Sequence, residues 1–309
     1  MLSMQSTASC RQIILRIGIL LFTIILASLS GLAHARSSQI YTLFTDPETL
    51  SKQLNHPAQI ILDVRDAEAY GKGHIPQAVN LAIGKTYNAT GRTDRVASID
   101  VIQKLLGNAG IDMLTHVIIY DDGSYKNAGR MFWVLEVFGL KHVKVLNGGI
   151  AAWRQQHLPL STTPYIPEKK IFIAAIQPDR LATKFTTQLA SQTGNRQIID
   201  SRSTDEYNGI ESITERKGHI PSARNVPWDR NYTTDVDGVA EIRPIKDLVK
   251  IYSFLDTRKP VITYCNKGKQ SSFTYLILRE LGYNVSHYDG SWYEWSNDVE
   301  LPIQHQKKP

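Results

Sequence analysis

The sequence predicts an α/β protein made of two similar domains in tandem, each with a mostly parallel central sheet flanked by helices. Short β-branched runs alternate with amphipathic stretches along the chain, which is typical of parallel strands connected by helices. Four sequence blocks also recur in the same order, about 140 residues apart. A repeat of this length indicates a duplicated domain rather than a short-period solenoid.

The repeated blocks define the two domains and the segment between them. The matched pairs, first copy then second, are 61–70 with 198–207, 73–81 with 218–226, 117–121 with 261–265, and 147–153 with 289–295. We therefore expect an N-terminal domain at about 40–157 and a C-terminal domain at about 186–305. The segment 158–185 between them begins with prolines spaced among Ser, Thr and Lys, which indicates an extended linker.

Each copy contains three apolar, β-branched runs that predict strands. The expected strands are 59–62, 117–120 and 143–146 in the first copy, and 197–199, 261–264 and 285–288 in the second. Apolar residues at helical spacing follow 261–265, and Gly282 is a suitable C-terminal stop for that helix. In parallel sheets, ligands bind at the carboxyl ends of the strands. We therefore expect the functional site at the end of 261–264.

Residues 1–35 have the order of regions typical of a secretory signal peptide. Two arginines come first, an apolar run from Ile17 to Leu29 follows, and small residues end at Ala35. We expect cleavage after Ala35 and export, to the periplasm in a bacterium, with no stable membrane association of the mature chain. The alternative is an uncleaved membrane anchor, for which the stretch from Ile13 to Leu29 is barely long enough.

Cys265 is the candidate nucleophile. The chain has two cysteines, and the other, Cys10, lies in the segment expected to be removed. A Gly-containing loop and a helix start follow Cys265, and both the loop N–H groups and the helix N-terminus favour a thiolate. A lone thiol in an exported protein is either reactive or prone to intermolecular pairing. Its position at a strand end favours the reactive interpretation.

Lys267 and Lys269 stand beside this thiol in the second copy only. One interpretation is that both are solvated side chains on an exposed loop. The other is that they capture an anionic substrate and further stabilise the thiolate. We favour the second interpretation for at least one of them, and for Lys267 first because it lies inside the loop.

The repeat separates structural motifs from functional ones, because only the second copy holds the cysteine. Motifs present in both copies are expected to serve the fold, namely the Gly-His-Ile-Pro stretches with His74 and His219, and the Asp-x-Arg pairs at strand ends. Arg202, in the second Asp-x-Arg pair, is also a candidate substrate contact. Asp121 occupies the position of Cys265 in the first copy, so the first domain is expected to be inert and to act as a wall or scaffold that shapes the cleft.

Two further groups of side chains are expected to be structural. Ser271 and Ser272 suit the first turn of the helix after the loop, where hydroxyl groups cap free N–H groups. The tryptophans of the last repeated block are expected in the core or at its rim, and they are Trp153, Trp292 and Trp295.

Together the blocks resemble the tandem-domain rhodanese family, the thiosulfate and mercaptopyruvate sulfurtransferases. The motifs are Asp-x-Arg followed by Glu-Tyr, Gly-His-Ile-Pro-x-Ala, a strand ending in Tyr-Cys-x-x-Gly-x-x-Ser, and Asp-Gly-Ser-Trp-x-Glu-Trp. They cover residues 40–303. The N-terminal copy in this family characteristically lacks the cysteine, which Asp121 matches. The resemblance therefore implies two tandem rhodanese-like domains, of which the second is catalytic.

The resemblance also implies a sulfur transfer through Cys265. The thiolate would take the sulfane sulfur of a small anionic donor, and backbone N–H groups of 266–270 would surround the persulfide, which makes Asn266, Gly268 and Gln270 substrate-binding candidates with the two lysines. Cyanide or a thiol would then accept the sulfur. Neither step needs a general base or a cofactor once the thiol is ionised.

The donor is expected to be thiosulfate, with mercaptopyruvate as the alternative. In the family, basic residues after the cysteine are associated with thiosulfate, and small neutral loops with mercaptopyruvate. Glu206 stands where the animal enzymes have an anion-binding arginine, whereas a bacterial subgroup resembles this chain there. Arg202, Arg216 or Lys217 are candidates to supply the positive charge.

Other function classes are less well supported. A cysteine phosphatase requires an arginine at the seventh position of the loop, and this chain has Ser271 there. There is no Cys or His cluster at metal-ligand spacing. The formal net charge is +6 without a long basic run, which does not indicate nucleic-acid binding. A persulfide carrier without turnover remains the alternative from a non-enzymatic class.

Overall fold

The computed structural model describes residues 42–89 and 95–305. The expected signal peptide, its cleavage after Ala35 and the possible anchor all lie outside these residues and stay predictions. Within the described ranges, no helix is both long and apolar enough to cross a membrane.

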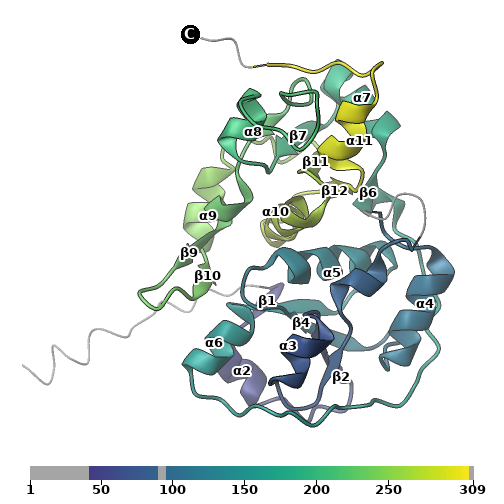
Figure 1. The fold of residues 1–309 in the computed structure, drawn as a ribbon, viewed down its shortest axis with the longest axis vertical. Helices are drawn as coiled ribbons and strands as arrows, with labels where there is room; N and C mark the ends of the chain where they lie inside the picture. Colours follow the sequence, from purple (N-terminus) through teal and green to yellow (C-terminus); the bar gives the residue numbers. More distant parts are fainter. Residues whose placement is uncertain (1–41, 90–94, 306–309) are drawn as a thin grey trace, which may run out of the picture. The chain divides into compact units, whose positions relative to one another are not determined.

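The first half of the chain forms a five-stranded parallel sheet with helices on both faces (Figure 1). Its strand order is β1-β5-β4-β2-β3. The strands are β1 Phe44–Thr45, β2 Gln59–Asp63, β3 Ala78–Asn80, β4 His116–Tyr120 and β5 Val143–Leu146. The helices are α2 Pro47–Ser51, α3 Ala67–Gly71, η2 Ile83–Thr86, α4 Ile99–Asn108, α5 Lys126–Val137 and α6 Gly149–Gln155.

The second half repeats this arrangement, with the order β6-β12-β11-β7-β8. Its sheet strands are β6 Leu181–Ala182, β7 Gln197–Asp200, β8 Arg224–Asn225, β11 Val261–Tyr264 and β12 Val285–Tyr288. The helices are η3 Pro178–Arg180, α7 Lys184–Thr193, α8 Thr204–Asn208, η4 Trp228–Asn231, α9 Ile245–Ile251, α10 Lys269–Glu280 and α11 Ser291–Asn297. A separate antiparallel pair, β9 Tyr232–Thr234 and β10 Ala240–Ile242, follows η4 in the second half. The predicted fold class is confirmed.

The motifs shared by both copies hold the sheet ends together, as predicted. The ring of His74 stacks on Tyr70 and its Nδ1 hydrogen-bonds the Tyr70 carbonyl at 3.0 Å. His219 repeats this on Tyr207 at 2.7 Å. Both histidines are buried. In each ring Nδ1 is satisfied by a nearby backbone carbonyl, as is typical of a structural histidine.

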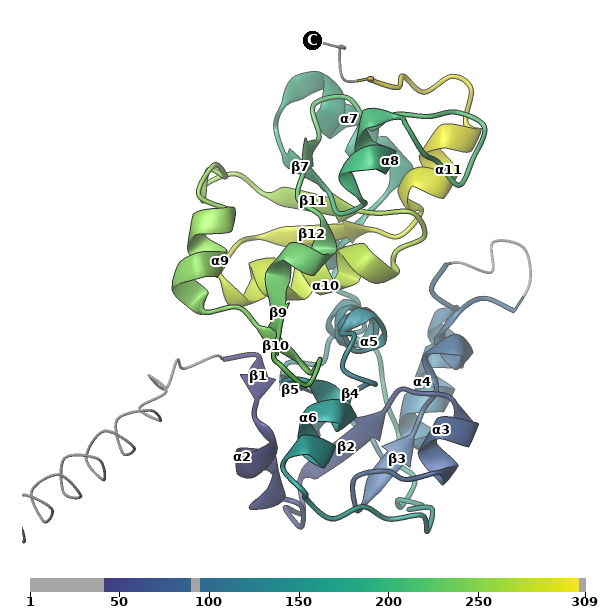
Figure 2. The same cartoon turned by 60° about the vertical axis from the view of Figure 1, so that its left-hand side comes forward.

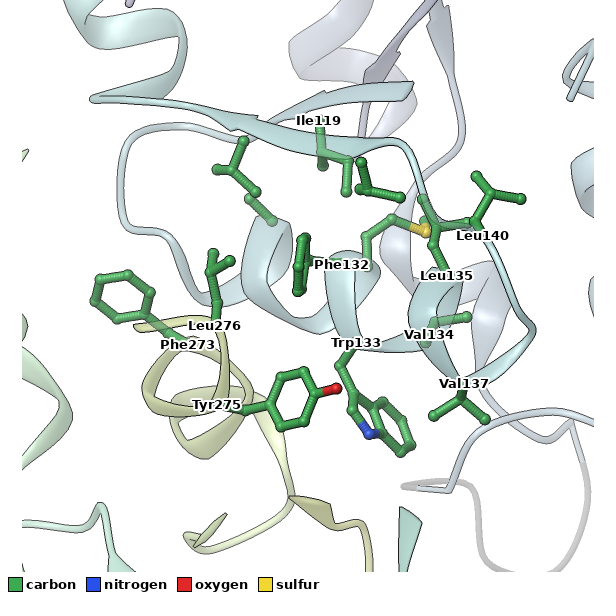
Figure 3. Packing of buried hydrophobic residues seen from close by; sticks show 14 of the residues in the cluster. Ile119, Phe132, Trp133, Val134, Leu135, Val137, Leu140, Phe273, Tyr275 and Leu276 are labelled. Carbon is green, nitrogen blue, oxygen red and sulfur yellow. The ribbon is translucent and has the colours of Figure 1, made fainter. Parts of the chain in front are cut away.

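Helices α5 and α10 pack against each other between the two sheets (Figure 2). Figure 3 shows their apolar side chains, including Phe132 and Trp133 of α5 and Phe273 and Tyr275 of α10, in one buried cluster. The approach is closest at Gly129, where an added Cβ would lie 2.8 Å from the Cα of Phe273. The helix backbones can therefore meet only because this position has no side chain.

Each half also extends a segment onto the other. The β9–β10 hairpin reaches the first half, where the Tyr125 hydroxyl donates to the Ala240 carbonyl at 3.1 Å and the Gln155 amide donates to Asp235 at 2.7 Å. In return, the Val96 N–H of the first half donates to the Asp289 carboxylate at 2.9 Å. These reciprocal contacts, with α5 and α10, fix the strand ends of the second sheet against the first half.

We predict that Gly129→Ala lowers the free energy of unfolding by about 1–3 kcal/mol, because its Cβ would overlap backbone atoms that cannot move aside cheaply. Urea unfolding measures this loss. Gly71→Ala is the matched control, since Gly71 ends a helix with open space around it and should change stability by less than about 1 kcal/mol. Equal stability of both variants would contradict the close helix contact.

Candidate functional site

Cys265 directly follows β11, and α10 begins four residues later at Lys269. The turn between them ends at Gly268, whose φ of 88° is favourable for glycine. The Gly268 N–H donates to the Cys265 Sγ at 3.2 Å. The main chain of Cys265 is held by the start of α11, since the Trp292 N–H donates to its carbonyl at 2.8 Å. The sequence therefore builds a short, anchored loop around a buried thiol.

The thiol opens into a pocket of about 500 Å³. The lining residues come from both halves of the chain and are Tyr87, Lys126, Ile213, Cys265, Asn266, Lys267, Lys269 and Gln270. Three of them are lysines, and none is acidic. The electrostatics of the pocket therefore favour a small anion.

Of the predicted site residues, the structure brings together Cys265, Asn266, Lys267, Lys269 and Gln270. Gly268 lies in the same loop, and its N–H contacts the thiol sulfur. The Lys267 ammonium lies 4.7 Å above the ring of Tyr293, which is a cation–π distance. These positions agree with a loop that receives an anion.

The corresponding loop of the first half is filled by its own carboxylate. Asp121 follows β4 and is buried, and its two oxygens accept the backbone N–H groups of Gly123, Tyr125, Asn127 and Ala128 at 2.9–3.3 Å. Burial and the nearby Asp122 raise the pKa of Asp121 to about 6, against the opposing effect of these N–H groups. At neutral pH it is therefore mainly ionised.

The first-half loop thus shows that this backbone geometry can surround an anionic group. An inward ring of N–H groups closes on a negative charge, which is the behaviour of an anion-binding nest. The Ile150 N–H donates to the Asp121 carbonyl at 3.0 Å, just as the Trp292 N–H donates to the Cys265 carbonyl. Position 121 is the structural equivalent of position 265.

A family model described as a rhodanese-like domain matches residues 46–156 and again residues 185–298. The chain belongs to the rhodanese family. A thiosulfate sulfurtransferase of Pseudomonas aeruginosa is 30% identical over 269 residues, covering 85% of this chain and 97% of the relative. A 3-mercaptopyruvate sulfurtransferase of Escherichia coli is 30% identical over 283 residues, covering 85% and 98%.

Solved structures agree with this membership. SseA from Escherichia coli, a 3-mercaptopyruvate sulfotransferase with the rhodanese fold, superposes with a TM-score of 0.73 at 29% identity, covering 81% of this chain and 99% of that chain. A complex of EanB with ergothioneine has a TM-score of 0.77 at 22% identity, covering 86% and 71%. The second likeness concerns the fold alone.

In this rhodanese, Arg202 does not line the pocket. Its guanidinium is fully buried, donates to Asp200 at 2.5 Å and to the Gly218 carbonyl at 2.8 Å, and lies over the ring of Trp292. The predicted structural ion pair is confirmed. The substrate contact also predicted for Arg202 is not supported, because the side chain is committed to the sheet end and has no exposed surface.

Arg216 and Lys217, the other basic candidates, are also hydrogen-bonded to backbone carbonyls away from the pocket. Arg216 donates to the carbonyls of Asp298 and Leu301, and the Lys217 ammonium donates to the carbonyl of Ile210. Glu206 accepts the Asn266 side-chain amide at 2.6 Å and so steadies the loop. Positive charge at the pocket therefore comes from its lysines rather than from these residues.

Ser271 and Ser272 lie in the first turn of α10, as expected, because the helix begins at Lys269. Their hydroxyl groups do not cap it, contrary to expectation. The Ser272 hydroxyl donates back to the Gly268 carbonyl at 2.5 Å, and the Ser271 hydroxyl meets His287 Nε2 at 2.9 Å. Burial, and then the charge of Arg130, lowers the pKa of His287 to about 3. His287 is therefore neutral near pH 7.

The first half was expected to form a wall or scaffold of the site, but the sequence did not identify the residues that do so. Arg130 of α5 is buried beside the loop, where an added Cβ at Gly268 would lie 2.9 Å from its Nη1. It donates to Asp289 at 2.5 Å and lies over the ring of Trp133. Tyr87 and Lys126 also reach the pocket from the first half. The four-residue spacing of Lys126 and Arg130 signals a shared helix face, but not which loop that face meets.

We predict that Asp121→Ala lowers the free energy of unfolding by about 2–4 kcal/mol, because it leaves several buried N–H groups without an acceptor. Urea unfolding at neutral pH measures this loss. The exposed neighbour Asp122 accepts only the Ser124 N–H among the described contacts, so Asp122→Ala should cost less than about 1 kcal/mol. Similar losses in both variants would contradict the filled-nest interpretation.

Proposed function

We propose that the chain is a sulfurtransferase that moves the outer sulfur of thiosulfate to cyanide or a thiol through a persulfide on Cys265. The observation that carries this proposal is the buried Cys265 thiol, which receives a loop N–H at the end of a pocket with three lysines. Family membership supports the general activity, since relatives that match nearly their whole length are named sulfurtransferases.

The first half-reaction is a displacement at sulfur. The Cys265 thiolate attacks the outer sulfur of thiosulfate, a carbon-free dianion, and a sulfur–sulfur bond forms at Sγ. The sulfur–sulfur bond of the donor breaks, and its electron pair leaves with sulfite. The loop N–H groups and the lysines stabilise the negative charge of donor, persulfide and sulfite alike.

In the second half-reaction the Cys265 persulfide is the sulfur donor. Cyanide or a thiolate attacks the outer sulfur of the persulfide, and the electron pair of the broken bond returns to Sγ. Thiocyanate, or the persulfide of the acceptor, leaves, and Cys265 is again a thiolate. No proton transfer is required when the nucleophiles are ionised. This agrees with His287 being neutral and its Nε2 being hydrogen-bonded to Ser271.

The lysines favour thiosulfate over mercaptopyruvate as the donor. Thiosulfate carries two negative charges in a small volume, whereas mercaptopyruvate carries one carboxylate and a carbonyl. Lys126, Lys267 and Lys269 all line the pocket, and desolvation together with repulsion from Lys126 and Arg130 lowers the pKa of Lys269. A compact dianion relieves such repulsion more than a monoanion does.

We predict that Cys265→Ser abolishes turnover with thiosulfate and cyanide while the thermal unfolding midpoint stays near that of the wild type, because a hydroxyl of similar size cannot form the persulfide. Steady-state thiocyanate formation and thermal melts measure both. The same assay with mercaptopyruvate compares donors, and we expect the higher kcat/KM for thiosulfate. An active, folded Cys265→Ser variant would contradict the mechanism. Loading without repeated turnover would support the carrier alternative.

We predict that Lys267→Ala raises the KM for thiosulfate about fivefold or more with little change in kcat, because it removes one charge that binds the donor. Initial rates over a range of thiosulfate concentrations measure this. Lys250→Ala, which removes an exposed lysine of α9 outside the pocket, is the matched control and should leave KM unchanged. An unchanged KM for Lys267→Ala would exclude Lys267 from donor binding.

A further inference from the structure

Helix α5 of the first half presents two basic residues to the Cys265 loop. Lys126 and Arg130 are four residues apart, so they lie on the same face of the helix, one turn from each other. Lys126 lines the pocket, and Arg130 lies beside Gly268. The close contact of α5 with α10 at Gly129, between these two residues, brings that face to the loop.

Lys126 is held in place rather than left free in solvent. Its ammonium lies 5.1 Å above the ring of Trp228, and the residue is half-buried. A cation–π contact of this kind restricts a long side chain without neutralising its charge. The full positive charge of Lys126 is therefore retained at the pocket.

The cations around the pocket are not balanced by an acid among the lining residues. Lys126 lines the pocket from the first half, and Lys267 and Lys269 line it from the Cys265 loop. Asp289 is already paired with Arg130. In the part of the chain that the structure describes, Arg130 Nε and Nη2 are buried without a hydrogen-bond partner. Positive charges that line one pocket repel each other until an anion binds among them. The arrangement thus points to a bound anion.

We propose that Lys126 is a donor-binding residue, so that the first half takes a direct part in recognising the sulfur donor. This inference rests on the proposed function. Lys267 and Lys269 contact the donor from the loop, and Lys126 contacts its oxygen-bearing end from the opposite wall. The outer sulfur is thereby left facing Sγ, and the charge of Lys126 also stabilises sulfite as it leaves.

The two half-reactions separate this role from a structural one. Thiosulfate is a dianion, so its attack by Cys265 should depend on Lys126. Dithiothreitol attacks as its monothiolate, which carries one charge on the attacking sulfur and has no anionic oxygen atoms for Lys126 to contact, so its removal of sulfur from a preloaded persulfide should change little. A residue that only supported the fold would affect both steps or the unfolding midpoint.

The experiment compares Lys126→Met, which keeps the apolar stem over Trp228, with Lys126→Arg, which keeps the charge. Lys104→Met is the control, since Lys104 is an exposed lysine of α4 outside the pocket. Rapid quench and intact mass measure the second-order rate constant of sulfur loading from thiosulfate. Samples preloaded at saturating thiosulfate and freed of donor measure sulfur removal by dithiothreitol.

We expect Lys126→Met to load about tenfold more slowly, with a weaker dependence on salt, while removal by dithiothreitol is unchanged. Lys126→Arg should recover most of the loading rate, and Lys104→Met should match the wild type. Wild-type loading in Lys126→Met, no recovery in Lys126→Arg, or equal slowing of both steps would overturn the inference alone. A wild-type protein that never loads would instead contradict the proposed function.

Discussion

The contact between α5 and α10 is the constraint on which the rest of the site depends. It is made possible by the missing side chain at Gly129, which lets the backbone of Phe273 approach. Since α10 begins at the end of the Cys265 loop, the position of α5 decides what lies opposite the thiol. The apolar cluster shared by the two helices therefore does more than stabilise the protein, because it also brings Lys126 and Arg130 of one half to the loop of the other.

Duplication supplies the second element of the site. Both halves end a central strand in a loop whose N–H groups donate to the side chain at the strand end, several of them to Asp121 in the first and that of Gly268 to Cys265 in the second. The two loops differ in what occupies them. In the first, the Asp121 carboxylate fills the nest and accepts its N–H groups. In the second, Cys265 leaves room for a substrate at the pocket. The same backbone can thus serve as a filled structural turn or as an open anion site, and one side chain separates the two.

Much of this could be predicted from the sequence, because it depends on local pattern. The strands at 143–146, 261–264 and 285–288 have the expected bounds, and the Asp200–Arg202 pair and the buried tryptophans follow from the repeat. The predictions that failed concern directions of side chains. Ser271 and Ser272 turn to His287 and to the Gly268 carbonyl, and Arg202 points into the sheet end. The first half was expected to shape the cleft, but its contributing residues could not be predicted, since nothing in the spacing of Lys126 and Arg130 specifies which helix of the other half they meet.

Intact mass and peptide mapping after a single exposure to thiosulfate test the sulfur-carrying role of Cys265 most directly. The mechanism predicts that each chain gains one sulfur atom, that the added mass lies on the peptide containing Cys265, and that cyanide removes it with release of one thiocyanate. A chain that gains no sulfur, or that carries it on another residue, would contradict the assignment of Cys265 as the group that receives sulfur from the donor.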